Sequence, residues 1–193
     1  MSSLYLVAGL GNPGPEYDRT RHNLGFLTVD ALAERLGAGK LKRSRKHSAL
    51  VADSRDGDHR LVLAKPQTFM NLSGRSIASL MNFYKVPLGD VIVVHDELDL
   101  PFGVVRVKLG GGTAGHNGLR SIVPAIGGDF VRVRIGIGRP MGRKDPVDFV
   151  LEAFTKSEAP EVSAIVGRAA DAVLSVVRDG VGAAQTEFNR REE

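Results

Sequence analysis

Two short apolar runs constrain the fold of this chain more than any other feature. Leu4 to Ala8 is an unbroken apolar run that stops at Gly9. Val91 to Val94 is another such run, and it stops at His95-Asp96. Runs this short are typical of strands buried on both faces, because a strand with one wet face would alternate apolar and polar residues. We therefore expect a sheet that other elements cover on both sides.

Helical patterns and alternating strands fill the rest of the chain. Apolar residues at helical spacing predict helices over residues 24–36, 73–84, 117–126 and 160–178. Further strands are expected at residues 49–52 and 60–65, as a hairpin around Asp56-Gly57, and at residues 104–109 and 131–137. Strands and helices interspersed in this way predict an α/β layered sandwich with a largely central sheet. Residues 1–193 are expected to form a single domain, with a loose tail over about 181–193.

Composition narrows the class of protein further. The 193 residues are 42% hydrophobic, which suits one domain with a substantial core. The chain has no cysteine, so disulfide frameworks and thiolate metal sites are excluded. No apolar run reaches the roughly 18 residues of a membrane helix. The first residues, Met1 to Leu4, lack the pattern of a signal peptide. We therefore expect a cytoplasmic protein with no membrane contact.

Basic residues are concentrated in one short segment. The net charge is a modest +4. Five of the seven residues from 40 to 46 are basic: Lys40, Lys42, Arg43, Arg45 and Lys46. This run is either a solvated loop or a patch that contacts phosphates, and on the run alone we favour the solvated loop.

Two glycine-rich segments raise the question of nucleotide binding. Gly9 to Gly14 fits the G-x-G-x-x-G pattern of dinucleotide-binding folds, but Pro15 follows directly and the helix starts about ten residues later. NAD binding is therefore disfavoured. Gly110 to Gly115 precedes a predicted helix without the Lys-Ser/Thr ending of a P-loop. This second loop is either a substrate-facing cradle or a mobile connection.

Polar residues follow or join the predicted elements at several junctions. Three histidines occupy such positions, His22, His95 and His116, and each is followed by Asn or Asp. Asn12 and Asn71 lie at similar junctions. Ligands of open α/β sheets gather at the carboxyl ends of strands, so these side chains are candidates for one shared site.

The sequence lacks the patterns of zinc and serine hydrolases. There is no H-E-x-x-H zinc pattern and no G-x-S-x-G elbow, and Ser73 lacks that context. A carboxylate metal site at residues 95–99 is disfavoured. His47 and His59 lie in polar sequence, where we expect them to be exposed and without a role. A water activated by histidine is therefore favoured over a serine nucleophile.

Six segments together resemble the bacterial peptidyl-tRNA hydrolase family. They are VAGLGNPG (7–14), YDRTRHNLG (17–25), KPQTFMNLSG (65–74), HDELDLPFG (95–103), GGGTAGHNGL (110–119) and VRIGIG (133–138). The resemblance implies a monomeric, single-domain α/β/α sandwich with a mixed, twisted sheet. It also implies an enzyme that hydrolyses the ester between a peptide and the 3′ ribose of tRNA, with no metal, cofactor or obligate protein partner.

The resemblance also implies roles for individual residues. Its catalytic residues are His22 as the base, Asp96 as the carboxylate that orients it, and Asn12. Asn71 and Asn117 correspond to the other asparagines that hold the substrate. The rest of the cleft for the peptide and the tRNA 3′ end corresponds to Tyr17, Phe69, Met70 and His116. Lys108 and Arg134 correspond to the pair that clamps the tRNA 5′ phosphate.

Alternation along two strands adds an argument about Lys108 and Arg134. Lys108 shares a strand face with Arg106, and Arg134 shares one with Arg132. If the two strands are neighbours, all four cations lie on one side of the sheet. We expect Arg106 and Arg132 to be ordinary solvated charges.

Two other classes of protein compete with the hydrolase. A non-catalytic RNA-binding relative of the same fold could lose the His-Asp pair, but His22 and Asp96 are both present. An NAD-dependent oxidoreductase is the third hypothesis, and it rests on the glycine pattern alone.

Overall fold

A single seven-stranded sheet organises the chain in the computed structural model, which describes residues 3–190. The strand order is β2-β3-β4-β1-β5-β7-β6. The strands are β1 (Leu4–Gly9), β2 (Lys42–Ser44), β3 (Ala49–Asp56), β4 (His59–Pro66), β5 (Val91–Glu97), β6 (Val105–Leu109) and β7 (Val131–Gly136). The four strands from β4 to β7 in this order are parallel, and antiparallel pairs join β2 to β3, β3 to β4 and β6 to β7. The sheet is therefore mixed, as expected.

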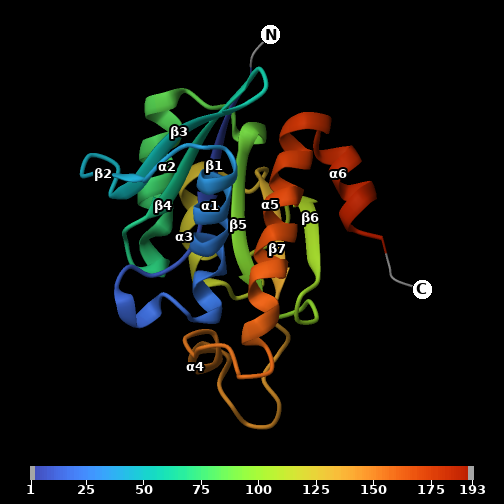
Figure 1. The fold of residues 1–193 in the computed structure, drawn as a ribbon. Coiled ribbons are helices and arrows are strands. Elements are labelled where there is room, and N and C mark those ends of the chain that lie inside the picture. The colour runs from blue at the N-terminus through green and yellow to red at the C-terminus, as the bar shows by residue number, and fades with distance from the viewer. Residues whose placement is uncertain (1–2, 191–193) are drawn as a thin grey trace.

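Helices cover both faces of the sheet (Figure 1). They are α1 (Leu24–Arg35), α2 (Ser73–Tyr84), α3 (Asn117–Ile126), α4 (Pro146–Val150), α5 (Val162–Asp179) and α6 (Val181–Phe188). One apolar core lies under α1 and α5, and a second lies under α2 and α3. The predicted α/β/α sandwich is confirmed. No helix in residues 3–190 is long and apolar enough to span a membrane.

The apolar runs of the two central strands are buried as predicted, except that Leu4 and Tyr5 at the start of β1 are half-buried. Every residue of β5 is buried. Ile92 and Val94 pack into the core under α1, while Val91 and Val93 pack into the core under α2 and α3. Because both faces are covered, neither face of the strand carries a polar stripe.

Three segments differ from the sequence-based expectation. β5 continues through His95-Asp96 to Glu97, which lies opposite Gly136 of β7. The basic run contains the short edge strand β2, in which charged residues hide the strand pattern. The expected loose tail after Gly180 is wrong for Val181–Phe188, which forms α6 and buries Ala184 and Phe188. The end of that expected tail, residues 191–193, lies outside the described residues.

Candidate active site

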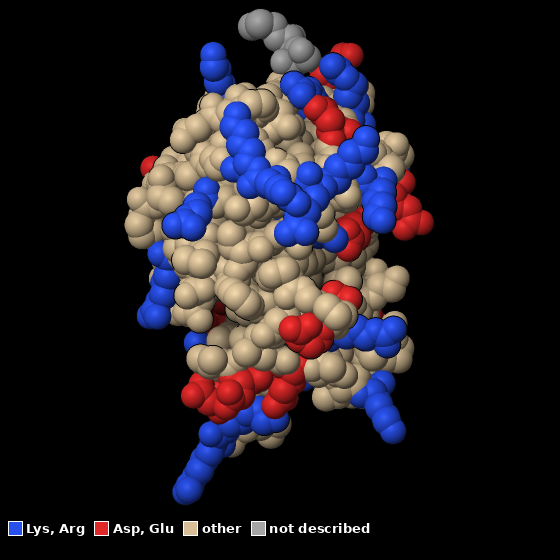
Figure 2. All heavy atoms as spheres, turned by 90° about the vertical axis from the view of Figure 1, so that its left-hand side faces the viewer, with Lys and Arg blue, Asp and Glu red and all other residues tan. Residues whose placement is uncertain are grey.

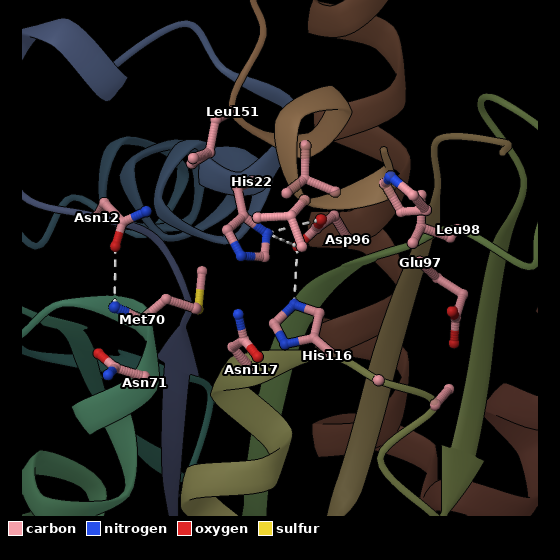
Figure 3. Close-up of a pocket in the computed structure, with 15 residues that line it drawn as sticks. Asn12, His22, Met70, Asn71, Asp96, Glu97, Leu98, His116, Asn117 and Leu151 are labelled. Atoms are coloured by element: carbon pink, nitrogen blue, oxygen red, sulfur yellow. Dashed lines mark hydrogen bonds and ion pairs between the residues drawn. The ribbon is translucent and has the colours of Figure 1, made fainter. Parts of the chain in front are cut away.

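The site forms where the parallel strands end. The carboxyl ends of β1, β4, β5 and β7 lie at the same end of the sheet. The loops after β1 and β4 meet the N-terminus of α3 there. They enclose a cavity of about 330 Å³ (Figure 3). Its polar lining includes Asn12, His22, Asn71, Asp96, Glu97, His116 and Asn117, and its apolar lining includes Met70, Leu98, Val147, Val150 and Leu151.

A close contact between glycines places His22 over the end of β5. A Cβ atom on Gly25 would clash with the backbone of Leu10 and Val94, and one on Gly9 would clash with Gly25. The N-terminus of α1 can therefore lie directly on β1 and β5, and the short helix η2 (Arg21–Asn23) precedes it. The first glycine of the G-x-G-x-x-G pattern serves this packing.

His22 and Asp96 form a buried pair. The Nδ1 atom of His22 lies 2.8 Å and 3.0 Å from the two carboxylate oxygens of Asp96, and both residues are buried. A carboxylate only accepts hydrogen bonds, so Nδ1 carries the proton and donates it. Nε2 of His22 is then left with a free lone pair. This arrangement presents a base to the cavity.

His116 makes a second hydrogen bond to the same carboxylate. Its Nε2 lies 2.9 Å from Oδ1 of Asp96. Its Nδ1 accepts hydrogen bonds from the backbone N–H groups of Gly118, at 3.0 Å, and Leu119, at 3.4 Å, and so caps α3. An accepting Nδ1 carries no proton, so Nε2 must be the donor. The cap of α3 thereby fixes the tautomer of His116.

The two imidazoles determine the charge state of Asp96. Burial alone would raise the pKa of this carboxyl group, but the adjacent His22 and His116 outweigh it by charge and hydrogen bonding. The pKa of Asp96 is therefore held well below its usual range. Asp96 stays ionised and can stabilise a positive imidazolium on His22.

His95 supports the site from the other face of β5. Its Nδ1–H donates to the Asp96 carbonyl oxygen at 2.7 Å, and its ring packs edge-on against His116. Burial, with the nearby His116 as the next cause, lowers the pKa of His95 to about 3. His95 is therefore a neutral support beneath the site.

Asn12 is oriented by its neighbours. Its Oδ1 accepts the Met70 backbone N–H at 2.8 Å, and its own backbone is held by the side chain of Asn23 at 2.8 Å and 3.0 Å. The amide nitrogen of Asn12 is thus directed away from Met70, as Figure 3 shows. It can offer N–H donors to a bound group. Asn23 has no role among the sequence-based predictions, and its position directly after His22 is the one signal that points to it.

The side chains of His22, Asp96 and His116 are also potential metal ligands. Among the described residues, His22, Asp96 and His116 bring potential ligand atoms within 4.8 Å of one another, which their distant positions in the sequence conceal. A metal ion would need a lone pair on Nε2 of His116. The proton would then move to Nδ1, where it would face the N–H groups of Gly118 and Leu119. The α3 cap therefore opposes a metal ion here.

Comparison with known proteins identifies the family. The family model for peptidyl-tRNA hydrolase matches residues 6–193. The chain belongs to the peptidyl-tRNA hydrolase family. It is 56% identical over 190 residues to the peptidyl-tRNA hydrolase of Mycobacterium tuberculosis, with 98% of this chain and 99% of that protein covered. The corresponding values for the Streptomyces coelicolor protein are 53%, 96% and 94%.

A solved structure of the same family has the same fold. The crystal structure of the Acinetobacter baumannii peptidyl-tRNA hydrolase matches with a TM-score of 0.92 at 39% identity, covering all of this chain and 97% of that one. The family and the hydrolase class expected from the sequence motifs are therefore confirmed. The roles of individual residues stay predictions.

Most site residues that the family resemblance implies come together in the cavity. They are Asn12, His22, Met70, Asn71, Asp96, His116 and Asn117. Phe69, next to Met70, is 59% exposed, and Tyr17 is half-buried in the short helix η1 (Pro15–Tyr17). Neither of these two lines the cavity itself.

The predicted tRNA clamp lies on β6 and β7, and neither of its residues lines the cavity. β6 and β7 are neighbours, with Arg106 opposite Arg134 and Lys108 opposite Arg132, so all four cations share one face. Lys108 is exposed. Arg134 is half-buried and donates from Nε and Nη2 to Glu97 at 3.1 Å and 3.0 Å.

Two polar residues differ from expectation. Arg132, expected to be solvated, is buried and donates to the carbonyl oxygens of Gly111, Gly112 and Gly128, so it anchors the glycine loop. His47, expected to be exposed, is buried, with Nδ1 2.7 Å from the Ser79 hydroxyl. Both depend on tertiary packing that the polar sequence around them conceals.

Arg21, like Asn23, supports the site although the sequence alone predicted no role for it. It is buried beside His22, pairs with Glu158 at 2.8 Å and donates to the Phe149 carbonyl at 3.1 Å. Its guanidinium also lies 3.9 Å from the centre of the Phe149 ring. Arg21 thereby ties the segment around α4, which forms one wall of the cavity, to the helix that carries His22.

Proposed function

We propose that this chain hydrolyses the ester bond between the peptide and the 3′-terminal ribose of peptidyl-tRNA, releasing free tRNA. The observation that carries the proposal is the buried His22–Asp96 pair, whose free Nε2 faces a cavity lined by asparagine amides. As the family resemblance implies, we expect a monomer. Its substrate is a product of translation, so we place its action in the cytoplasm.

His22 acts as the general base in this reaction. Its Nε2 takes a proton from a water molecule, and the water oxygen bonds to the ester carbonyl carbon. Asp96 stabilises the imidazolium that forms, as the carboxylate of a triad does. When the tetrahedral intermediate collapses, the bond to the ribose oxygen breaks and His22 returns the proton to that oxygen. The products are a free 3′ hydroxyl and a peptide carboxylic acid, which releases its proton to solvent and becomes a carboxylate.

Asn12 is our candidate for stabilising the oxyanion. Its Oδ1 is occupied by the Met70 N–H, so its amide nitrogen faces the cavity as a donor. A donor held in place before the reaction stabilises charge that develops on the carbonyl oxygen. This gives a chemical role to Asn12, which the family resemblance implies is a catalytic residue.

The remaining cavity residues bind the substrate. Asn71 and Asn117 offer amide donors and acceptors that match a peptide backbone. Met70 in the cavity, together with Tyr17 and Phe69 outside it, supplies apolar contact to peptide side chains and to the terminal base. His116 holds Asp96 at the cavity floor.

Lys108 and Arg134 are proposed to bind the tRNA 5′ phosphate. They are diagonal neighbours on the paired strands β6 and β7. Diagonal neighbours are about 7–8 Å apart, so two long cationic side chains can converge on one phosphate.

The ester needs only an activated water and an oxyanion donor, so the proposed reaction uses no metal or cofactor.

Deacylation of purified N-acetyl-aminoacyl-tRNA tests the proposal. The wild-type protein should release tRNA at the same rate with and without EDTA. His22→Ala should lower kcat by about 10²- to 10⁴-fold, the usual contribution of a general base. His59→Gln, which changes a histidine outside the cavity, is the matched control and should retain the wild-type rate.

Each other outcome contradicts a stated part of the proposal. Tight binding of tRNA without hydrolysis by the wild-type protein would favour a non-catalytic RNA-binding protein. Full loss with EDTA, restored by a divalent cation, would overturn the metal-free mechanism. A wild-type rate in folded His22→Ala would remove His22 as the base.

A further inference from the structure

We propose that the turn between β2 and β3 holds a second phosphate site, which binds the tRNA backbone on the side of the cleft away from Lys108 and Arg134. This inference rests on the function proposed above. A hollow of about 260 Å³ lies at this turn. It is lined by Arg43, Ser44, Arg45, Ser48, Ala49 and Gln67.

The chemistry of the lining favours an anion. Arg43 and Arg45 supply guanidinium groups, which match phosphate oxygens in geometry and charge. The serine hydroxyls and the Gln67 amide can donate further hydrogen bonds. No carboxylate lines the hollow. Within residues 3–190, neither arginine forms an ion pair, so their charge is not neutralised by the protein.

The hollow lies at the same end of the sheet as the active site, where the parallel strands have their carboxyl ends. Ala49 is opposite Pro66 at the carboxyl end of β4, and the Gln67 N–H donates to the Ser48 carbonyl at 2.7 Å. Gln67 precedes Met70, whose N–H binds Asn12, by only three residue steps. Three residues span at most about 11 Å. The hollow is therefore close enough to the cleft to contact the backbone of an RNA strand whose 3′ end is bound there.

Protection of a sheet edge is the competing explanation for these charges. β2 is an edge strand, and lysine or arginine on such a strand prevents pairing with other chains. This explanation covers Lys42 and Arg43, which lie in β2, but not Arg45, which lies beyond the strand in the turn. Lys46 is excluded from the site because it lies over the Phe83 ring, 4.2 Å from its centre.

Charge on the surrounding surface supports an approaching polyanion. Figure 2 shows the side of the molecule that carries β2 in Figure 1, with Lys and Arg gathered across its upper part and Asp and Glu along the upper right and across the lower part. β2 and β6 are the two edges of the sheet. The proposed phosphate site and the Lys108–Arg134 clamp therefore flank the cleft, so tRNA would be held at two points.

Steady-state kinetics of an Arg43→Gln/Arg45→Gln double variant test the site. KM for full-length N-acetyl-aminoacyl-tRNA should rise about twofold to fivefold per arginine, as for solvated charge pairs. The slope of log KM against log salt should fall by about one for one lost phosphate contact. A minimal substrate, one 3′-terminal adenosine with its N-blocked amino acid, should keep the wild-type kcat/KM. Arg45→Glu should raise KM more than Arg45→Gln.

Arg55→Gln is the matched control. Arg55 is exposed on β3 at the far end of the hairpin, and its loss should change neither KM nor the salt slope. An unchanged KM for full-length substrate in the double variant would overturn the second phosphate site. Equal losses on both substrates would also overturn it, since they indicate damage to the fold or the cleft. A wild-type protein that cleaves neither substrate would instead overturn the proposed function itself.

Discussion

His116 shows how one side chain can join catalysis to the packing of a helix. Its Nδ1 caps α3 and its Nε2 donates to Asp96. In His116→Asn the amide oxygen can still cap the helix, whereas the hydrogen bond to Asp96 is lost. In His116→Ala both interactions are lost. We expect kcat to fall in both variants, by less than the factor for His22→Ala.

Thermal or urea unfolding separates the two roles of His116. His116→Ala should be about 1 kcal/mol less stable than His116→Asn, the usual value of an N-cap. Equal stability of the two variants would show that the ring does not act as a cap. A wild-type kcat in His116→Asn would show that Asp96 does not need its second donor.

The sequence predicts which residues meet at this scale but not how they bond. His22, Asp96 and His116 stand at element junctions, so their meeting at a strand end is predictable. Their tautomers depend on the exact position of the α3 N-terminus, which local patterns do not determine. The buried contacts of Arg21 and Arg132 are likewise set by carbonyl groups of distant segments.

Elements with long, regular patterns were predicted well, and short or charged ones were not. The bounds of α2, Ser73–Tyr84, agree with its apolar spacing. By contrast, α4 (Pro146–Val150) is too short to show a repeating helical pattern of apolar residues. β2 (Lys42–Ser44) has two basic residues, which hide a strand pattern. In α6 only Ala184 and Phe188 are buried, so its pattern is weak.

The register of β6 and β7 supports a prediction about the clamp. Lys108 and Arg134 lie diagonally on one sheet face, outside the cavity. Lys108→Ala should therefore raise KM for full-length peptidyl-tRNA and flatten its salt dependence, because phosphate contacts release counterions. It should have little effect on a substrate with only the 3′-terminal nucleotide. Arg106→Ala, on the same strand face, is the control with a smaller expected effect, because its guanidinium donates to the Phe188 carbonyl. An equal loss of kcat/KM on both substrates would contradict the proposed role of Lys108 in the clamp.

At the scale of the whole molecule, the buried His95 links stability to pH. Its pKa is lowered from 6.5 to about 3, chiefly by burial and then by His116. Between these values the unfolded chain binds a proton that the folded chain does not. The stabilisation is therefore complete above pH 6.5 and is lost as the pH falls toward 3. Asp96, whose pKa is also lowered, adds a loss of stability only below its usual value of 3.8.

Urea unfolding between pH 4.5 and 7.5 tests this link. From His95 alone, the free energy of unfolding should fall by up to about 1.4 kcal/mol for each unit of decreasing pH. His95→Asn keeps a side-chain donor for the Asp96 carbonyl but cannot titrate, so its stability should depend less steeply on pH. The buried His47, whose pKa is also lowered by burial, adds to the trend in both proteins, and only the difference in slope reports on His95. Equal slopes in the two proteins would mean that His95 takes up its proton in the folded state as readily as in the unfolded chain. The interpretation of His95 as a neutral side chain that supports Asp96 would then be wrong.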